Sequence, residues 1–282
     1  MGRRLSLIYK SLKTWTLHTI LCAYVLLTLI PLIWILLSAF KTNVDIMVNP
    51  LGPPTGLYTE NFINTWVDAH IGTYFLNSVL VSVISTIVTL WFASTAAFAL
   101  TRMFFKKLSQ VLTTMIVMGL TVPAGVLLVP LYFIIVDLHI YNSYLALIMP
   151  YITFGLPFAI VVMMSFMRSI PDEILEAAIM DGSPITYLFR KIVVPLTLPI
   201  FVTIFILTYI SNWNEFVMAQ FYTSDMNLRT LPVGMVAFRD QFHTNYVGIA
   251  VGVMYSITPV LIIYALLQEK IISGLTSGSI KG

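Results

Sequence analysis

The stretch from Ile71 to Thr101, IGTYFLNSVLVSVISTIVTLWFASTAAFALT, runs for 31 residues without an aspartate, glutamate, lysine or arginine. A helix needs about 20 predominantly apolar residues to cross the hydrocarbon core of a bilayer. This stretch is longer than that and uncharged, so it predicts a transmembrane helix. Its extra length is consistent with tilt or with interfacial turns.

Five further windows share this character, at residues 17–40, 108–136, 140–167, 192–214 and 241–268. Only 10% of the 282 residues are charged, whereas soluble domains carry about 25%. So few charges do not cover the surface of a soluble domain of this length. The sequence therefore predicts an all-α integral membrane protein with six transmembrane helices. They are expected at 17–39, 73–100, 110–135, 142–167, 197–221 and 245–268.

Basic residues are distributed unequally between the two ends of these helices. Of the 15 lysines and arginines, only Lys41, Arg229 and Arg239 fall on one side, and the rest fall on the other. Cytoplasmic segments carry the excess of lysine and arginine, so both termini are predicted to be cytoplasmic. The first window follows a basic start, but it is too long for a signal peptide and no A-x-A site follows Phe40.

This topology predicts five parts of the chain. They are a cytoplasmic segment 1–16, the first transmembrane helix 17–39, an external loop 40–71, a five-helix core 72–268 and a cytoplasmic tail 269–282. The core contains a cytoplasmic loop at 168–196. The single cysteine, Cys22, excludes a disulfide within the chain, and no Cys/His spacing typical of a metal site occurs, so no metal is expected.

The third and fifth helices carry residues that interrupt a simple apolar rod. Gly119, Pro123 and Gly125 predict a kink in the third. In the fifth, Asn212, Asn214 and Glu215 are candidates for the wall of a translocation path, because a charge at membrane depth usually faces water or the protein interior. A hydrogen-bond cluster between helices, or an interfacial helix end, explains these three residues equally well.

The loop at 168–196 predicts two short helices joined by a tight turn. We expect Ser169 to cap the first helix, from Pro171 to Met180, and Gly182 to end it with a positive φ. Ser183 is expected to cap the second.

The first of these two helices has an apolar face with an acidic start. The apolar residues at helical spacing are Ile174, Leu175, Ala178 and Ile179. Asp172 and Glu173 in its first turn oppose binding to anionic lipid. These features favour a protein partner over the membrane surface.

Within this loop, Glu176-Ala177-Ala178, Asp181-Gly182, Ile192 and Pro195 resemble the EAA loop of bacterial ABC importer permeases. The pattern of that family is E-A-A, three residues, G, nine residues, I, and then L-P two or three residues on. The chain matches this spacing through Ile192 and departs mildly at Val194-Pro195, where Leu-Pro is usual.

The resemblance extends over nearly the whole chain, and it is closest to the carbohydrate-uptake branch, in particular the smaller permease of the maltose importer. The stretches that carry it are Asn77-Ser78, Ala96 to Arg102, Pro130 to Tyr132, Trp213 to Phe216, Leu231 to Gly234 and Gly274 to Thr276. It implies the fold of a type I ABC importer transmembrane domain in a bacterial cell membrane.

The resemblance also implies what the chain does and with what. It implies a transport subunit of an ATP-driven sugar importer that catalyses no reaction itself. The implied partners are a second permease, two ATPase subunits that bind ATP and Mg²⁺, and an external sugar-binding protein. The implied ATPase-coupling residues are Glu176, Ala177, Ala178, Asp181 and Gly182. The chain has no G-x-x-x-x-G-K-[ST] motif, so ATP hydrolysis is expected on another polypeptide.

By the same resemblance, the outer loop 222–244 is expected to contact the binding protein. Phe238, Phe242 and Tyr246 are spaced four apart and form a candidate aromatic anchor face, or they pack the loop onto the ends of the helices. Two other classes of protein stay open. A secondary transporter or channel needs ionisable residues in its spans, where only Glu215 is present. A membrane-embedded enzyme needs a catalytic cluster, and none is recognisable.

Overall fold

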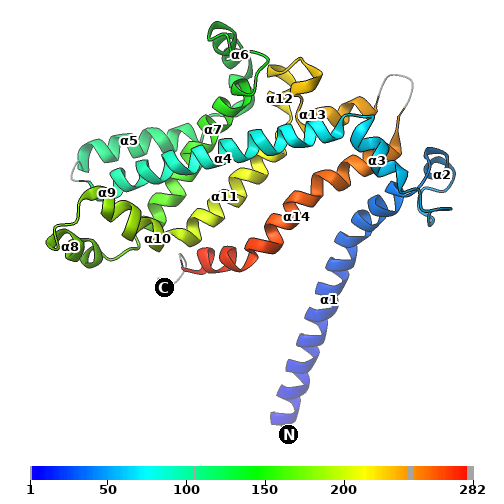
Figure 1. The fold of residues 1–282 in the computed structure, drawn as a ribbon. Helices are drawn as coiled ribbons and strands as arrows, with labels where there is room; N and C mark the ends of the chain where they lie inside the picture. Colours follow the sequence, from blue (N-terminus) through cyan, green and yellow to red (C-terminus); the bar gives the residue numbers. More distant parts are fainter. Residues whose placement is uncertain (1, 104–105, 240–243, 278–282) are drawn as a thin grey trace. The chain divides into compact units, whose positions relative to one another are not determined.

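The computed structural model describes residues 2–103, 106–239 and 244–277. Most of the chain in these ranges is helical, and the only extended pairing within them is an isolated bridge between Arg239 and Thr244. The α-helices, labelled in Figure 1, are α1 Gly2–Ala39, α2 Asn43–Val48, α3 Glu60–Val67, α4 Ile71–Arg102, α5 Lys106–Gly119, α6 Leu128–Asp137, α7 Leu145–Met167, α8 Asp172–Met180, α9 Ile185–Tyr187, α10 Val194–Leu196, α11 Leu198–Trp213, α12 Val217–Tyr222, α13 Leu231–Gly234 and α14 Tyr246–Ser277. Short 3₁₀ turns lie at Ala124–Leu127, Met226–Leu228 and Met235–Phe238, and a π-helical stretch lies at Leu188–Val193.

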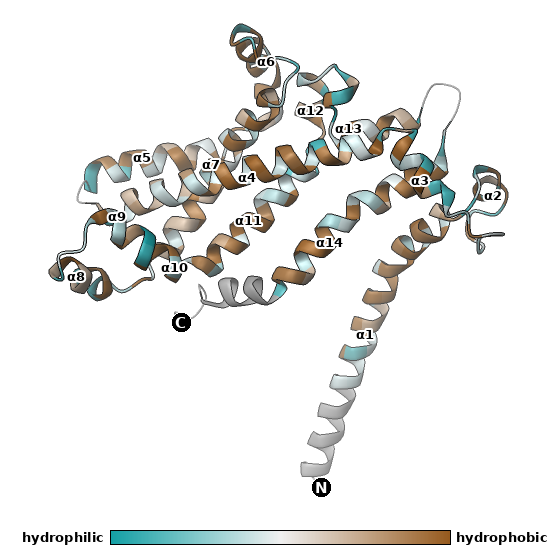
Figure 2. Cartoon of the chain, in the orientation of Figure 1, coloured by the Kyte–Doolittle hydropathy of each residue, from teal (hydrophilic) through white to brown (hydrophobic). Residues whose placement is uncertain are grey.

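Four helical stretches are each long and apolar enough to cross a membrane by themselves: Thr14–Ala39, Ile71–Arg102, Leu145–Met167 and Tyr246–Gln268. Two bent pairs of helices bring the number to six if each pair makes one crossing. Figure 2 shows hydrophobic residues along α1, α4 and α14, with hydrophilic residues mostly in the connecting segments. The predicted all-α membrane fold is confirmed.

Two of the predicted helices differ from the structure. The single helix predicted at 110–135 is wrong: α5 ends at Gly119, and the chain turns by 87° before continuing through Ala124–Asp137. The predicted kink is therefore a break. The helix predicted at 197–221 is also too long, because α11 ends at Trp213 and meets the segment before it at 74°. In the third window composition did not show where α5 ends, and in the fifth the polar residues Asn214 and Glu215 lie beyond the end of α11.

The chain divides into two compact units, which we describe separately. The larger comprises Ile71–Val236 and Ser256–Gly282. Its core is formed by α4, α7 and α11, and α4 faces its neighbours with small residues that are 0–2% exposed: Ser82, Ser85, Thr86, Thr89, Ala93, Ser94 and Ala97. A side chain added at Gly155 of α7 would contact Thr89 and Thr208 at 3.3–3.5 Å. Small residues thus let three helices approach closely, as is typical of packing in membranes.

The smaller unit comprises Met1–His70 and Ala237–Tyr255. Its buried cluster consists of Ala39, Ile46, Val247, Ala250 and Val251. The ring of Phe62 packs edge-on against Tyr255 with the ring centroids 6.2 Å apart, and the Tyr255 hydroxyl donates to the Phe62 carbonyl at 3.2 Å. These contacts hold together three parts of the smaller unit: the end of α1, the segment that contains α2 and α3, and the start of α14.

Candidate functional site

The loop at 168–196 changes direction after α8 (Figure 1), and Gly182 lies two residues beyond the end of that helix. Gly182 has a φ of 76°. Its N–H donates to the Ile179 carbonyl at 2.9 Å, and the Ser183 N–H donates to the Ala178 carbonyl at 3.0 Å. These two bonds form the Schellman motif that closes a helix end. The prediction that Gly182 ends the helix with a positive φ is confirmed.

The two predicted serine caps do not form. The Ser169 hydroxyl donates to the Phe166 carbonyl at 2.7 Å, and the residue before α8 is Pro171, which makes no side-chain cap. In the same way Pro184, and not Ser183, precedes α9. Both prolines have the extended ψ that a cap position requires, so the fixed backbone of proline takes the place of a side-chain acceptor.

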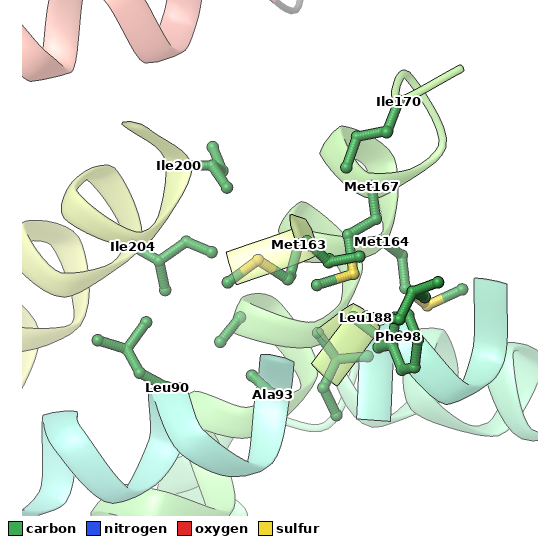
Figure 3. Close-up of a cluster of buried hydrophobic side chains, with 14 of the residues drawn as sticks. Leu90, Ala93, Phe98, Met163, Met164, Met167, Ile170, Leu188, Ile200 and Ile204 are labelled. Atoms are coloured by element: carbon green, nitrogen blue, oxygen red, sulfur yellow. The ribbon is translucent and has the colours of Figure 1, made fainter. Parts of the chain in front are cut away.

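One side of α8 is anchored in the apolar core. Leu175 and Ala178 are 6% and 7% exposed and pack in one cluster with Leu188 and Phe98. Figure 3 shows Phe98 and Leu188 lying beside the methionines of α7, including Met164. The predicted apolar face of α8 is only partly buried, because Ile174 and Ile179 are exposed. The loop is thus held against α4 and α7 by its inner stripe alone.

Arg102, the last residue of α4, joins three segments at this point. Its guanidinium forms an ion pair with Asp172 in the first turn of α8. It also donates to the carbonyls of Met167, at the end of α7, and Ile170, the latter at 2.7 Å. The carbonyls at a helix C-terminus lack partners within the helix and carry partial negative charge, so a guanidinium is well suited there. This is the one ion pair found within the described ranges.

A cavity of about 690 Å³ separates α8 from the end of α4 and the start of α5. The residues of α8 that line it are Asp172, Leu175, Glu176 and Ile179, which share one face of the helix. The opposite face carries Glu173, Ala177 and Met180, all exposed. Of the predicted coupling residues, Glu176, Ala177, Asp181 and Gly182 are exposed, whereas Ala178 is buried.

Glu215 lies between α11 and α12 and is fully engaged in hydrogen bonds. Its carboxylate accepts from the N–H groups of Met218 at 2.8 Å and Ala219 at 3.0 Å, which open α12. It also accepts from the Tyr151 hydroxyl of α7 at 2.7 Å. A carboxylate at a helix N-terminus satisfies free N–H groups and complements the helix dipole. This arrangement corresponds to the structural alternative that the sequence left open.

The two asparagines of the fifth predicted helix lie in different surroundings. Asn212 is buried, and its side-chain amide donates to the Thr86 hydroxyl of α4 at 3.3 Å. Asn214 is exposed, and its amide donates back to the Ile210 carbonyl at 2.9 Å. The three candidates for a path therefore do not share one surface.

The three predicted aromatic contacts also separate. Phe238 is 8% exposed and packs on Gly248, where an added side-chain carbon would lie 2.5 Å from its ring. Tyr246 opens α14 and is 46% exposed. Phe242 lies outside the described residues. Because a 3₁₀ turn ends at Phe238 and α14 begins only at Tyr246, these two residues do not share a helical face.

Residues 89–273 match the family described as the inner membrane component of binding-protein-dependent transport systems. The match covers well over half of the chain. This chain belongs to that family.

Similar proteins support this membership over nearly the full length. The permease is 38% identical to a probable ABC transporter permease of Bacillus subtilis, covering 92% of this chain and 86% of the relative. It is 35% identical to the sulfoquinovosyl glycerol transport system permease of Agrobacterium fabrum, covering 90% and 89%. It is 30% identical to a diacetylchitobiose uptake system permease of Streptomyces coelicolor, covering 94% and 88%.

A solved structure confirms the fold. A chain of a bacterial ABC transporter involved in alginate import matches the permease with a TM-score of 0.78 and 21% identity, covering 89% of this chain and 93% of that one. With the family match and these relatives, the chain is a membrane permease of the ABC importer type, a transport component.

Sequence reasoning missed the residues that tie this permease together across long separations. Arg102 was counted as a topology signal and as part of a stretch that resembles the family, but no contact was predicted for it, although it bonds residues 65–70 positions further along. Tyr151, the partner of Glu215, was not singled out at all. An arginine that ends a transmembrane helix is the one signal that points to such a contact, but nothing local names its partners.

Proposed function

We propose that this permease imports a carbohydrate. Relatives at 30% identity or more are named for transport of sulfoquinovosyl glycerol, diacetylchitobiose and trehalose. Each of these molecules contains sugar units, which supports a glycoside or an oligosaccharide as the substrate. The translocation path would be formed together with a second permease, and an external binding protein would deliver the sugar.

In this proposal ATP and Mg²⁺ are bound by two separate ATPase subunits, and the permease supplies the surface on which they dock. The observation that carries the proposal is the two-sided placement of α8. One side is anchored in the core by Leu175 and Ala178, while Ala177 and Met180 on the other side are exposed, Met180 by 86%. A helical face outside the predicted spans that exposes Ala177 and Met180, with Glu173 beside them, is suited to a groove on a partner.

The predicted coupling residues then have distinct roles. Ala177 lets the ATPase approach closely, because its side chain is small and exposed. Ala178 allows α8 itself to approach the core. Glu176 and Asp181 offer carboxylates to basic groups of the ATPase, and such charge-assisted contacts contribute about 1.5–3 kcal/mol each. Gly182 fixes where the helix stops.

Movement of the ATPases would reach the membrane helices through the contacts on the inner side of α8. Arg102 connects the first turn of α8 to the ends of α4 and α7, and Leu175 packs in the same cluster as residues of these helices. A displacement of α8 is therefore transmitted to α4 and α7 together. Alternating access requires such a mechanical connection between the ATPases and the membrane helices.

The other candidate contacts are proposals of the same kind. Of Asn212, Asn214 and Glu215, the exposed Asn214 is best placed to face a path, whereas the hydrogen bonds of Glu215 support a role in holding helix ends. On the outer side, Tyr246 is the exposed candidate for the binding protein, and the burial of Phe238 supports a role in packing the loop.

We also propose the predicted topology and its boundaries, with both termini cytoplasmic in a bacterial cell membrane, the core at 72–268 and the coupling loop at 168–196. Cysteines placed at Ser6 and Ser279, in a chain lacking Cys22, should react with an impermeant reagent only after the cells are permeabilised. Labelling of either position in intact cells would refute this orientation.

Function is tested by uptake of labelled sugars in cells lacking the gene. Restored uptake of one sugar class by the wild-type gene identifies the substrate. Ala177→Leu should abolish that uptake and reduce capture of the ATPase, while Ala177→Ser, which keeps a small side chain, should retain both. If Ala177→Leu imports normally, α8 is not the docking element.

A further inference from the structure

The exposed part of α1 has the dimensions of a bilayer. Every residue from Trp15 to Trp34 is exposed, and the stretch is apolar apart from its threonines and His18. The two tryptophans are 19 positions apart, about 29 Å at 1.5 Å per residue, and the hydrocarbon core is about 30 Å thick. Tryptophans gather at the two membrane interfaces. Trp34 therefore marks the boundary near the end of α1.

The segment 40–59, which we call the α2 lobe, is fixed at this boundary. The indole N–H of Trp34 donates to the Pro50 carbonyl at 2.6 Å. The ammonium of Lys41, only 1% exposed, donates to the carbonyls of Asn49 at 2.9 Å and Pro50 at 3.3 Å. The lobe thus folds back onto the last turns of α1 at the depth of the interfacial tryptophan.

Further hydrogen bonds fix the conformation of the α2 lobe. The Asn61 side chain donates to the carbonyls of Ala39 and Lys41, both at 2.9 Å. Thr42 and Asp45 form a reciprocal capping box at the start of α2, and the Thr55 hydroxyl donates to the Asp45 carboxylate at 2.7 Å. The side chains that the lobe exposes are therefore held in place by its backbone.

This built segment exposes large aliphatic side chains. Val44, Met47 and Val48 lie on one face of α2, at positions i, i+3 and i+4, and are 68%, 73% and 79% exposed. Leu51, just after α2, is 82% exposed. Apolar groups gathered outside a membrane span mark a contact with a partner or with lipid.

Charge distinguishes between kinds of lipid. Lys41 is the only basic residue of the lobe, and its ammonium is buried on backbone carbonyls. The hydrogen bond from Thr55 lowers the pKa of the Asp45 carboxyl, so that group stays ionised. Elements that bind anionic lipid expose lysines and arginines, and this lobe exposes none. Its surface is suited to a neutral or zwitterionic interface.

We propose that the α2 lobe is a membrane-interface element, with Val44, Met47 and Val48 inserted between the headgroups and acyl chains of zwitterionic lipid. Protein interfaces are enriched in aromatic residues, methionine and arginine, and of these residue types this face carries only Met47. The lobe also follows the exposed apolar stretch of α1 directly, and Trp34 of that stretch bonds it at Pro50. The lobe thereby fixes the depth of α1 in the bilayer.

The test uses the full transporter complex in phosphatidylcholine nanodiscs, with Cys22→Ser as the background. A small environment-sensitive fluorophore is attached at Met47→Cys or Val48→Cys. Asn64→Cys, at an exposed polar position of α3 in the same unit, is the matched control. We expect nitroxide-labelled phosphatidylcholine to quench the fluorophore at positions 47 and 48, and aqueous iodide to quench it at position 64.

Three outcomes would overturn the proposal. Strong quenching by iodide at both 47 and 48 would show a wet surface. Weak quenching by both reagents would show that protein covers the face. A marked gain in lipid quenching when phosphatidylglycerol is added would show that anionic lipid is needed, against the charge argument. None of these readouts depends on which substrate the transporter carries.

Discussion

Replacement of Gly182 tests the coupling loop most directly, because the structure separates backbone strain from steric bulk at this position. Gly182 has a φ of 76°, and a side-chain carbon added there would meet nothing within 4 Å. The penalty of a substitution therefore comes from the left-handed backbone alone, about 1 kcal/mol for alanine and about 2 kcal/mol for a β-branched residue. Asparagine adopts this conformation more readily than other residues.

The size of the effect follows from the shortness of α8. A helix of nine residues is only marginally stable without its surroundings. The cap therefore contributes to a closely balanced equilibrium between the folded and the frayed C-terminal turn of α8. A penalty of about 1 kcal/mol changes the ratio of capped to frayed ends by about fivefold. Gly182→Ala should raise the hydrogen-exchange rate of the last turn of α8 by about that factor, Gly182→Val by more, and Gly182→Asn by little.

The assay is amide exchange by mass spectrometry on the complex, with capture of the ATPase and sugar uptake measured in parallel. ATPase capture and sugar uptake should be highest with glycine at position 182 and should decrease through asparagine and alanine to valine. The hydrogen-exchange rate of the last turn of α8 should increase in the same order. Asparagine is larger than alanine, so a ranking by side-chain volume, with Gly182→Asn worse than Gly182→Ala, would refute the backbone argument. Equal exchange in all four proteins would refute the cap itself.

Three further changes test other contacts. Arg102→Gln removes charge-assisted bonds that contribute about 1.5–3 kcal/mol each, so ATPase activity stimulated by loaded binding protein should fall at least about tenfold with the ATPase still attached. Glu215→Ala leaves the Tyr151 hydroxyl and the first N–H groups of α12 without their acceptor. The free energy of unfolding of the complex should therefore fall by about 1–3 kcal/mol, and its melting temperature should fall with it. Gly234→Ala places a carbon 2.0 Å from the buried ring of Tyr74 and should destabilise the complex by about 1–3 kcal/mol.

Each of these changes has a control or a contrary result. Arg168→Gln, at an exposed arginine near the same loop, should leave stimulation unchanged; equal losses in both variants would remove the special role of Arg102. Unchanged stability with lost uptake in Glu215→Ala would place Glu215 in the path after all. Gly125→Ala meets nothing within 4 Å and should melt like the wild type, in contrast to Gly234→Ala.

The coupling loop was the part of the fold that local sequence rules predicted best. The end of α8 at Gly182 follows from backbone sterics, which act on neighbouring residues and are readable in the sequence. The start of α8 was predicted less well, because Pro171, and not Ser169, occupies the N-cap position. Helical spacing placed Ala178 with Leu175 on one apolar face, but it did not show that these two residues pack in the core of the chain itself.

The membrane helices show a different limit. Composition predicts where lipid surrounds the chain, but it does not report the direction of a helix within the apolar stretch. The chain turns after Gly119, inside a window that was predicted as one continuous span, and again at Thr197, where the fifth helix was predicted to begin. The prolines and glycines near these turns allow a bend, while its angle is set by neighbouring helices that a single sequence does not specify.

If the bend between α5 and α6 lies at membrane depth, we expect it to need cover from a second subunit. Lipid offers no hydrogen bonds, so irregular backbone at membrane depth persists only where protein or water covers it. Leu120 and Val122, within the bend, are 46% and 43% exposed, and α5 has no buried residue. We therefore expect this permease, when it is made without the proposed second permease, to be degraded faster by membrane proteases than when the two are made together.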